Sequence, residues 1–153
     1  MIYTVQFNAV AVTAQQDFFE LVAAATQILR IHELGLNQVS EIGDAQEEGL
    51  SILLKSGQTT TGSGGTTPTA VPMEFLAAAA TFTPKANNTT KATVGTIVTH
   101  HAWSWNVRMP FQMIWTPETR PLISPSRRAT VELATTPADS ITVSGYITVE
   151  QLG

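Results

Sequence analysis

The fold is decided by one alternating stretch, Ser140-Ile141-Thr142-Val143-Ser144-Gly145-Tyr146-Ile147-Thr148-Val149. Apolar and hydroxyl-bearing residues take turns along it, which is the period of a β-strand with one face in a core. We assign Ile141, Val143, Tyr146 and Val149 to the apolar set of this strand. The stretch therefore predicts a strand that is half-buried in a sheet.

Further runs of the same kind occur along the chain, separated by turn signals. A second alternating run covers residues 128–134, and Pro137-Ala138-Asp139 after it predicts a tight turn. The first residues also alternate and predict a strand with Tyr3, Val5 and Phe7 inward. Other predicted strands cover residues 18–22, 50–55 and 107–115. The last is interrupted at Pro110, which implies a sheet edge or a bulge.

About eight to ten short strands separated by turns are typical of a β-sandwich. The 153 residues are enough for one domain with a substantial core. The sequence therefore predicts an all-β fold, a single jelly-roll-like β-sandwich over residues 1–153, with long polar loops.

Three segments have a less certain pattern. Residues 14–34 suit either a helix or a strand–loop–strand unit, and Phe18-Phe19 and residues 28–32 favour the strands. Within residues 73–82, the Ala-rich run from Phe75 to Ala80 predicts one or two turns of helix. Residues 84–90 are polar and predict a loop.

The longest polar, glycine-rich stretch is Gln58-Thr59-Thr60-Thr61-Gly62-Ser63-Gly64-Gly65-Thr66-Thr67-Pro68, which predicts a loop. A loop of this length in a compact domain is more often functional or disordered than a simple turn. Two interpretations stay open, a mobile excursion and an arm that becomes ordered against a neighbouring molecule. Under the second, the candidate interface residues are Thr60, Thr61, Thr66 and Thr67.

Composition limits the classes of partner. Charged residues are only 13% of the chain, against a usual share of about 25%. Either partners cover much of the surface, or the outer strand faces are rich in threonine hydroxyls. The net charge of −4 argues against a nucleic-acid partner. No apolar run is long enough to predict a membrane span, and there is no cysteine.

The charges are unevenly distributed along the sequence. Residues 1–50 hold seven acidic residues against only Arg30, whereas residues 101–130 hold four arginines against only Glu118. This asymmetry would orient a head-to-tail association of copies. The simpler interpretation is that these are solvated loop charges.

No set of residues predicts catalysis or cofactor binding. His100 and His101 are adjacent, so on a regular strand they point to opposite faces and cannot form one metal site, with or without His32. The glycine-rich loop lacks the Lys-Ser/Thr of a phosphate loop. An acidic segment around Asp44, Glu47 and Glu48 suits a solvated loop better than a carboxylate pair. We expect no enzyme activity, no cofactor and no bound metal.

Three tryptophans are the large aromatic anchors of the chain. Trp103 and Trp105 share one face of a predicted strand, and Trp115 follows. The favoured interpretation is that they belong to the core. The alternatives are a sugar-binding platform and an anchor at a subunit interface, for which Trp103 and Trp105 are the candidates.

A series of turn motifs resembles a known family. The motifs occur in one order along nearly the whole chain: Gly43–Glu48, Gly64–Thr69, Asn87–Thr90, Pro117–Pro125 and Pro137–Ser140. In this order they resemble the small head decoration, or capsid cement, proteins of tailed phages and prophages. The Ala-rich segment at Leu76 to Thr81 departs from the polar connector expected there.

The resemblance implies a structural virion protein without catalytic residues. Such a protein is made in the host cytoplasm, forms a homotrimer and sits on the outer capsid surface. Its partner is the major capsid protein, whose subunits it holds together by adding buried interface. Two other classes stay open: a carbohydrate-binding or fibre-tip module that uses exposed tryptophans, and a glycan-active enzyme with facing carboxylates.

Overall fold

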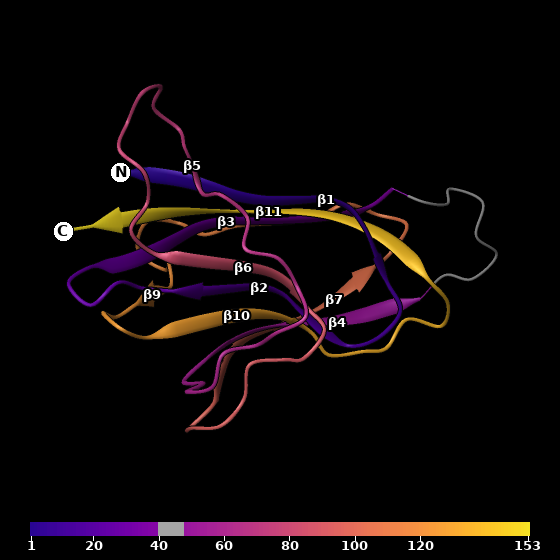
Figure 1. Ribbon diagram of the computed structural model, residues 1–153. Helices are drawn as coiled ribbons and strands as arrows, with labels where there is room; N and C mark the ends of the chain where they lie inside the picture. Colours follow the sequence, from indigo (N-terminus) through magenta and orange to yellow (C-terminus); the bar gives the residue numbers. More distant parts are fainter. Residues whose placement is uncertain (40–47) are drawn as a thin grey trace.

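The chain folds into two antiparallel β-sheets that pack face to face as a sandwich (Figure 1). The computed structural model describes residues 1–39 and 48–153. The predicted all-β sandwich is confirmed. In these two ranges no helix is long and apolar enough to cross a membrane.

Each sheet has a simple antiparallel order. The strands of the first are β1 (Ile2–Val12), β3 (Ile28–Gln38), β5 (Val71–Pro72), β8 (Phe111–Ile114), β9 (Leu122–Ile123) and β11 (Ile141–Leu152). Their order is β5-β1-β11-β3-β8, with β9 paired to β3. We call this the β1 sheet. The strands of the second are β2 (Gln16–Val22), β4 (Gly49–Ser56), β6 (Thr83–Asn88), β7 (Val98–Asn106) and β10 (Arg128–Leu133). Their order is β6-β2-β10-β4-β7, and we call it the β2 sheet.

The connectivity is that of a jelly roll. Eight strands make up the jelly roll: β1, β11, β3 and β8 lie in one sheet, and β2, β10, β4 and β7 lie in the other. Along the chain the path crosses between the sheets, so that β1 pairs with β11, β2 with β10, β3 with β8 and β4 with β7. This is the double Greek-key arrangement. The connection from β4 to β7 adds β5 to one sheet and β6 to the other.

The core lies between the sheets and follows the alternation of the strands. On β11, Ile141, Val143, Ile147 and Val149 are at most 1% exposed. Tyr146 was assigned to this set wrongly, because the alternation places it on the outer face, where it is half-exposed. Burying each large apolar side chain stabilises the fold by about 1.5–3 kcal/mol.

The inward-facing residues predicted for the first strand are confirmed. Tyr3, Val5 and Phe7 of β1 are all buried. The Phe7 ring packs against Phe18 and Phe19 of β2, with ring centroids 5.9 and 5.2 Å apart. These rings join the two sheets through the middle of the sandwich.

The uncertain segments are now assigned. Residues 14–34 form strand, loop and strand, as favoured, because β2 and β3 flank a turn at Ala25 and Thr26. The predicted loop at residues 84–90 is wrong, because most of it belongs to β6, an edge strand. Pro84 lies near the start of this edge strand, a place in a sheet where proline is tolerated.

Two further expectations are corrected. Residues 75–80 form no helix, and only one turn closes there, from the Ala77 N–H to the Glu74 carbonyl at 3.3 Å. Residues 107–115 do not form one strand. A turn at residues 107–109 carries the chain from β7 in the β2 sheet to β8 in the β1 sheet. The predicted edge at Pro110 is confirmed, because β8 is the outermost strand of its sheet.

Candidate interaction surface

The threonine- and glycine-rich loop lies on the outer face of the β2 sheet and is held there by its own chain. The Thr60 N–H donates to the Thr93 carbonyl at 2.9 Å, and Thr66 exchanges two backbone hydrogen bonds of 2.9 Å with Ala86 of β6. Gly65 makes the close approach: a Cβ at this position would lie 2.2 Å from the Ala86 carbonyl oxygen. We call residues 57–68 the covering loop.

Glu20 of β2 lies beneath the covering loop and is fully buried, at 0% exposure. Its Oε1 accepts the Thr61 hydroxyl at 2.8 Å, and its Oε2 accepts the Gly62 N–H and the Asn88 side-chain amide at 2.9 Å. Arg128 Nε lies 3.0 Å from Oε1, which makes an ion pair, although the N–H is not aimed well enough for a hydrogen bond. Because a buried carboxylate needs partners, Glu20 joins the loop to β6 and β10.

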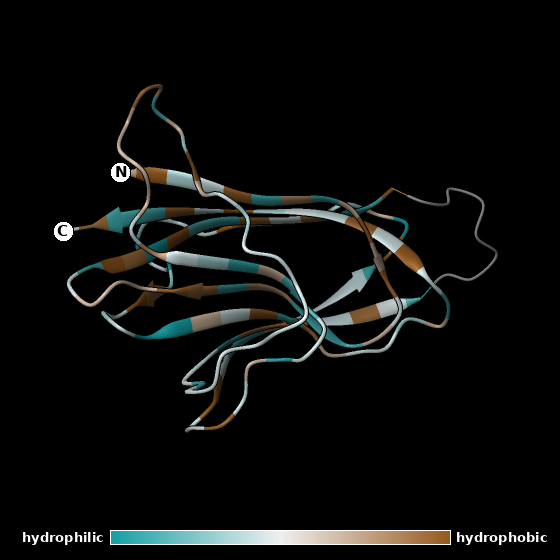
Figure 2. Cartoon of the chain, viewed as in Figure 1, coloured by the Kyte–Doolittle hydropathy of each residue, from teal (hydrophilic) through white to brown (hydrophobic). Residues whose placement is uncertain are grey.

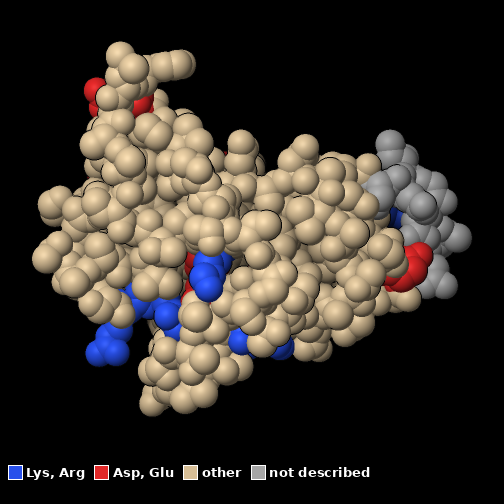
Figure 3. All heavy atoms as spheres, in the orientation of Figure 1, with Lys and Arg blue, Asp and Glu red and all other residues tan. Residues whose placement is uncertain are grey.

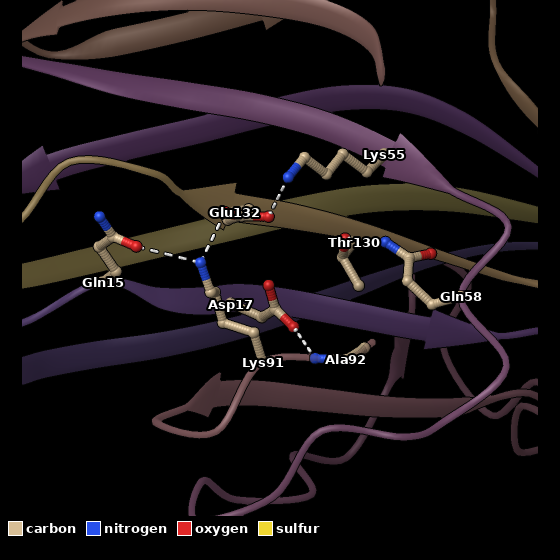
Figure 4. Close-up of polar contacts among 8 residues, drawn as sticks. All are labelled: Gln15, Asp17, Lys55, Gln58, Lys91, Ala92, Thr130 and Glu132. Carbon is tan, nitrogen blue, oxygen red and sulfur yellow. Dashed lines mark hydrogen bonds and ion pairs between the residues drawn. The ribbon is translucent and has the colours of Figure 1, made fainter. Parts of the chain in front are cut away.

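A second buried carboxylate, Asp17, holds the next part of the cover (Figure 4). Asp17 is 1% exposed, and its Oδ2 accepts the Ala92 N–H at 2.7 Å. Burial raises its pKa from 3.8 to about 7, aided by the charges of Glu132 and Glu20, while the Ala92 bond and Lys91 oppose the rise. Asp17 therefore carries a proton over much of the acidic range.

Glu132, directly opposite Asp17 on β10, remains ionised by contrast. Its carboxylate receives Lys55 Nζ at 2.6 Å and Lys91 Nζ at 2.9 Å, as Figure 4 shows. Burial favours a higher pKa, but the two lysines outweigh it and hold the pKa of Glu132 below its ordinary value. Lys91 also donates to Gln15 at 3.1 Å. The cluster fixes the segment after β6 on the sheet.

The predicted interface threonines lie on the outside of this assembly. Thr60, Thr61, Thr66 and Thr67 are all exposed. The backbone of Thr60 and Thr66 is hydrogen-bonded to Thr93 and Ala86, so the loop presents an ordered, uncharged surface to solvent. Thr61 alone has its hydroxyl turned inward, onto Glu20. The covering loop is thus ordered without a neighbour, and its contact with another molecule stays a prediction.

The tryptophans differ in their burial. Trp105 is 2% and Trp115 4% exposed, as the core interpretation predicted, and Trp105 Nε1 donates to the Met109 carbonyl at 2.7 Å. Trp103 is half-buried and packs between the imidazole of His101 and the rings of Phe111 and Trp115. The three do not form an exposed row, so only Trp103 keeps a surface for a partner.

The histidines are held in separate places. His32 Nε2 lies 3.1 Å from Glu150, His101 stacks on Trp103, and His100 Nε2 lies 2.7 Å from the Ser56 hydroxyl. Among the described residues no group of three or more His, Cys, Asp or Glu is placed to hold a metal ion. The Ser56–His100 contact is a serine–base pair that the sequence pattern did not reveal. The structure shows no acidic side chain bound to that imidazole within the described ranges.

The acidic segment is only partly described. Asp44 and Glu47 lie outside the described residues, and Glu48 Oε2 accepts the Ala138 N–H at 2.9 Å. Two surface depressions of about 450 and 490 Å³ are lined by no Asp or Glu among the described residues. Facing carboxylates of a glycan-active enzyme are therefore not found in either depression.

An apolar tip projects from the sandwich between β5 and β6 (Figures 1 and 2). We define it as Met73, Phe75 and Leu76, which are 66%, 98% and 102% exposed. Its base is fixed, since the Tyr3 hydroxyl donates to the Ala78 carbonyl at 3.0 Å. The sequence raised residues 76–81 as a departure from the expected polar connector but did not predict a projecting tip.

Charge is distributed unevenly over the surface. On the face in Figure 3, most of the visible Lys and Arg atoms lie over the β2 sheet, in the lower half. The visible acidic atoms lie mainly beside the apolar tip, where Glu74 stands between Met73 and Phe75 in the sequence, and at the opposite end. Much of the remaining face is uncharged.

The chain was compared with models of protein families, with curated proteins and with solved structures, and none of the three comparisons finds a match.

Proposed function

We propose that this protein is a capsid decoration protein, a homotrimer that binds the major capsid protein on the outer surface of a phage head. The observation that carries the proposal is the apolar tip. Phe75 and Leu76 gain no burial from their own chain, and exposed aromatic and aliphatic anchors of this kind are typical of protein interfaces.

The conformation of the tip supports a role in binding. Leu76 has a φ of 65°, a left-handed conformation that is uncommon for a residue with a branched side chain. Backbone conformations of this kind tend to occur where function requires them. Here the turn keeps both apolar side chains directed away from the sandwich.

The fold and the covering loop agree with this proposal. Jelly rolls are frequent in viral capsids, although a fold alone does not establish a function. The hydrogen-bonded threonine surface supplies uncharged contacts without the need to order a mobile arm, which lowers the entropic cost of binding. On a symmetric lattice, several weak contacts per trimer add up to firm attachment.

In mechanism, the protein would stabilise the head by mass action. A ligand that binds only the assembled lattice shifts the assembly equilibrium toward the lattice. The free energy gained grows with the logarithm of the ratio of ligand concentration to dissociation constant. Contacts that bridge neighbouring capsid subunits would oppose their separation under internal pressure. No catalytic step and no cofactor are involved.

The test is co-sedimentation with empty heads assembled from the major capsid protein of the same genome. We expect the protein to pellet with the heads at concentrations on the order of micromolar. The double variant Phe75→Ser/Leu76→Ser should bind at least tenfold more weakly, since hot-spot truncation costs about 2 kcal/mol or more. Its melting temperature should not fall, because both side chains are already exposed.

The matched control is Ile114→Ser, which removes an apolar side chain that is 65% exposed on β8. It should bind heads as the unmodified protein does. If the unmodified protein stays in solution with intact heads, the decoration proposal fails. A stable monomer in light scattering would contradict the homotrimer. Equal weakening of head binding by both variants would contradict the role of the apolar tip in binding.

A further inference from the structure

The outer face of the β1 sheet carries one aromatic ring laid across its strands. Cross-strand pairing aligns Gln6 of β1, Tyr146 of β11, Gly35 of β3 and Gln112 of β8 in a single row. The Tyr146 ring crosses above Gly35, where a Cβ would lie only 2.2 Å from a ring carbon. Because Gly35 has no side chain, the ring can lie low over β3 and leave its other side toward solvent.

The hydroxyl end of this ring is fixed. Tyr146 donates to Glu33 Oε1 and accepts from Gln112 Nε2 at 3.0 Å. Burial and the neighbouring carboxylate of Glu33 raise the pKa of Tyr146, so the phenol keeps its proton at neutral pH. Gln112 also donates to Glu33 at 2.7 Å. Both hydrogen-bonding partners hold the ring in place before any ligand arrives.

A depression of about 490 Å³ adjoins the ring on β1 and β11, which lie side by side in Figure 1. Its polar lining consists of amides and hydroxyls: Gln6, Asn8, Asn37, Ser144 and Tyr146. No lysine, arginine, aspartate or glutamate lines it. The depression forms beside a bulge between Phe7 and Val10, where the register of β1 against β11 shifts.

Part of this lining is fixed and part is free to bind. The Ser144 hydroxyl donates to Asn8 Oδ1 at 2.8 Å and accepts the Ala9 N–H at 2.9 Å. The exposed side chains of Gln6 and Asn37 make no hydrogen bond in the described structure. Each amide offers donors and an acceptor. The site therefore has a positioned framework and two unused amide groups.

We propose that this depression binds a neutral pyranose sugar, with the Tyr146 ring beneath the apolar C–H face of the sugar. A pyranose matches the lining because it has one apolar face and a rim of hydroxyls that both donate and accept hydrogen bonds. The absence of a lining cation disfavours carboxylated or phosphorylated ligands, which call for Arg or Lys. This inference goes beyond the decoration proposal and does not depend on it.

The geometry places the aromatic platform where the sequence did not. Tryptophan is the usual candidate for stacking on a sugar, but Trp105 and Trp115 are buried and Trp103 packs within an aromatic cluster. Tyr146 is the ring that combines partial exposure with adjoining amides. The platform exists because Tyr146 faces outward on β11 and because Gly35, its partner on β3, leaves room for the ring.

The experiment is a titration of the isotope-labelled protein with methyl β-D-glucopyranoside and methyl β-D-galactopyranoside, followed by NMR. We expect at least one of them to bind with a dissociation constant on the order of 1 mM, as befits a small ligand. The amide resonances that shift should be those of Gln6, Asn8, Asn37 and residues 144–146. Methyl β-D-glucuronide, a glucuronic acid glycoside in which a carboxylate replaces the hydroxymethyl group of the glucoside, should bind more weakly.

Three variants test the platform. Tyr146→Ala should lose at least tenfold in affinity, and Gly35→Ala should do the same by displacing the ring while keeping every lining side chain. Trp103→Phe is the matched control and should bind normally. Spectra of each variant without sugar show whether it is folded. No binding of either neutral glycoside by the unmodified protein, full affinity in folded Tyr146→Ala, or tighter binding of the glucuronide would each overturn the proposal.

Discussion

The outer faces of the two sheets have opposite characters. On the β2 sheet the outer face is covered by the chain itself, and Asp17 and Glu20 are 1% and 0% exposed beneath that cover. On the β1 sheet the outer face is open, and Gln6, Asn8 and Asn37 are exposed. One face therefore contributes to internal order, and the other presents polar groups to solvent. Polar side chains on the β2 sheet bind the chain's own loops and stabilise the fold, whereas those on the β1 sheet are available to bind another molecule.

The largest expected effect is the loss of Glu20. Glu20→Ala leaves Arg128 without its buried counter-charge and removes the acceptor of Thr61, Gly62 and Asn88. Breaking a buried pair from one side costs about 3–5 kcal/mol. We expect urea denaturation to show a fall of that size in the free energy of unfolding.

The control for this experiment lies on the open face. Glu150 pairs with Arg30 at 3.3 Å and with His32 at 3.1 Å, and its side chain is 24% exposed. Glu150→Ala should cost no more than about 1 kcal/mol, since exposed pairs contribute little. Similar losses in the two variants would show that the faces do not differ energetically.

The next effect concerns pH. The folded pKa of Asp17 is raised from 3.8 to about 7. Between these values the folded protein keeps a proton that the unfolded chain releases, so the free energy of unfolding falls as the pH rises. The contribution is fully lost above the folded pKa and amounts to at most about 4 kcal/mol.

Asp17→Asn isolates this contribution, because the amide can still accept the Ala92 N–H but does not titrate. Denaturation should be measured in steps from about pH 4.5 to pH 7.5. The free energy of unfolding should fall with pH in the unmodified protein and should fall less steeply in the variant. Parallel curves for the two proteins would contradict the assigned pKa of Asp17.

The smallest of the three effects tests the covering loop directly. Gly65→Ala places a methyl group 2.2 Å from the Ala86 carbonyl oxygen, so the loop has to move away from β6. Overpacking of this kind costs about 1–3 kcal/mol. Hydrogen exchange of the Thr66 and Ala86 amides, which bond to each other's carbonyls, should become faster.

Gly49→Ala serves as the control for this loop variant. There the added methyl meets only the Ser104 hydroxyl, at 3.0 Å, and that side chain can rotate away. The exchange of the Thr66 and Ala86 amides should remain as in the unmodified protein. Unchanged exchange in Gly65→Ala as well would mean that the loop does not depend on its contact with β6.

The alternation of strands was sufficient to predict the sandwich. Residues 2–7 and 141–149 have the period of a half-buried strand, and they pair as β1 and β11. The prediction failed where burial depends on distant segments. Residues 84–90 look polar, yet Asn87 and Asn88 are buried because Gln16 and Glu20 bind their side chains. The Ala-rich residues 77–80 have helix propensity, but propensity is weak without a packing surface.

The candidate site was harder to predict than the fold. The threonines of the covering loop could be named from composition, but Glu20, the carboxylate that fixes this loop, comes from β2, far away in the sequence. Nothing local marks Glu20 as buried. Tyr146 was misassigned for a simpler reason: Gly145 takes an inward position, so that the apolar sequence Tyr146-Ile147 straddles both faces of the strand.

The insertion between β4 and β7 has a consequence for how copies of the chain can aggregate. It supplies the outermost strand of both sheets on one side, through β5 and β6. β5 has only two residues and β6 contains Pro84, and short or proline-containing edges resist pairing with another chain. The opposite side ends in β8, which has only four residues, and in β7, which has nine and is the longer open edge. Strand addition between molecules would therefore start at β7, and a proline or lysine placed there is the substitution to choose against fibril growth.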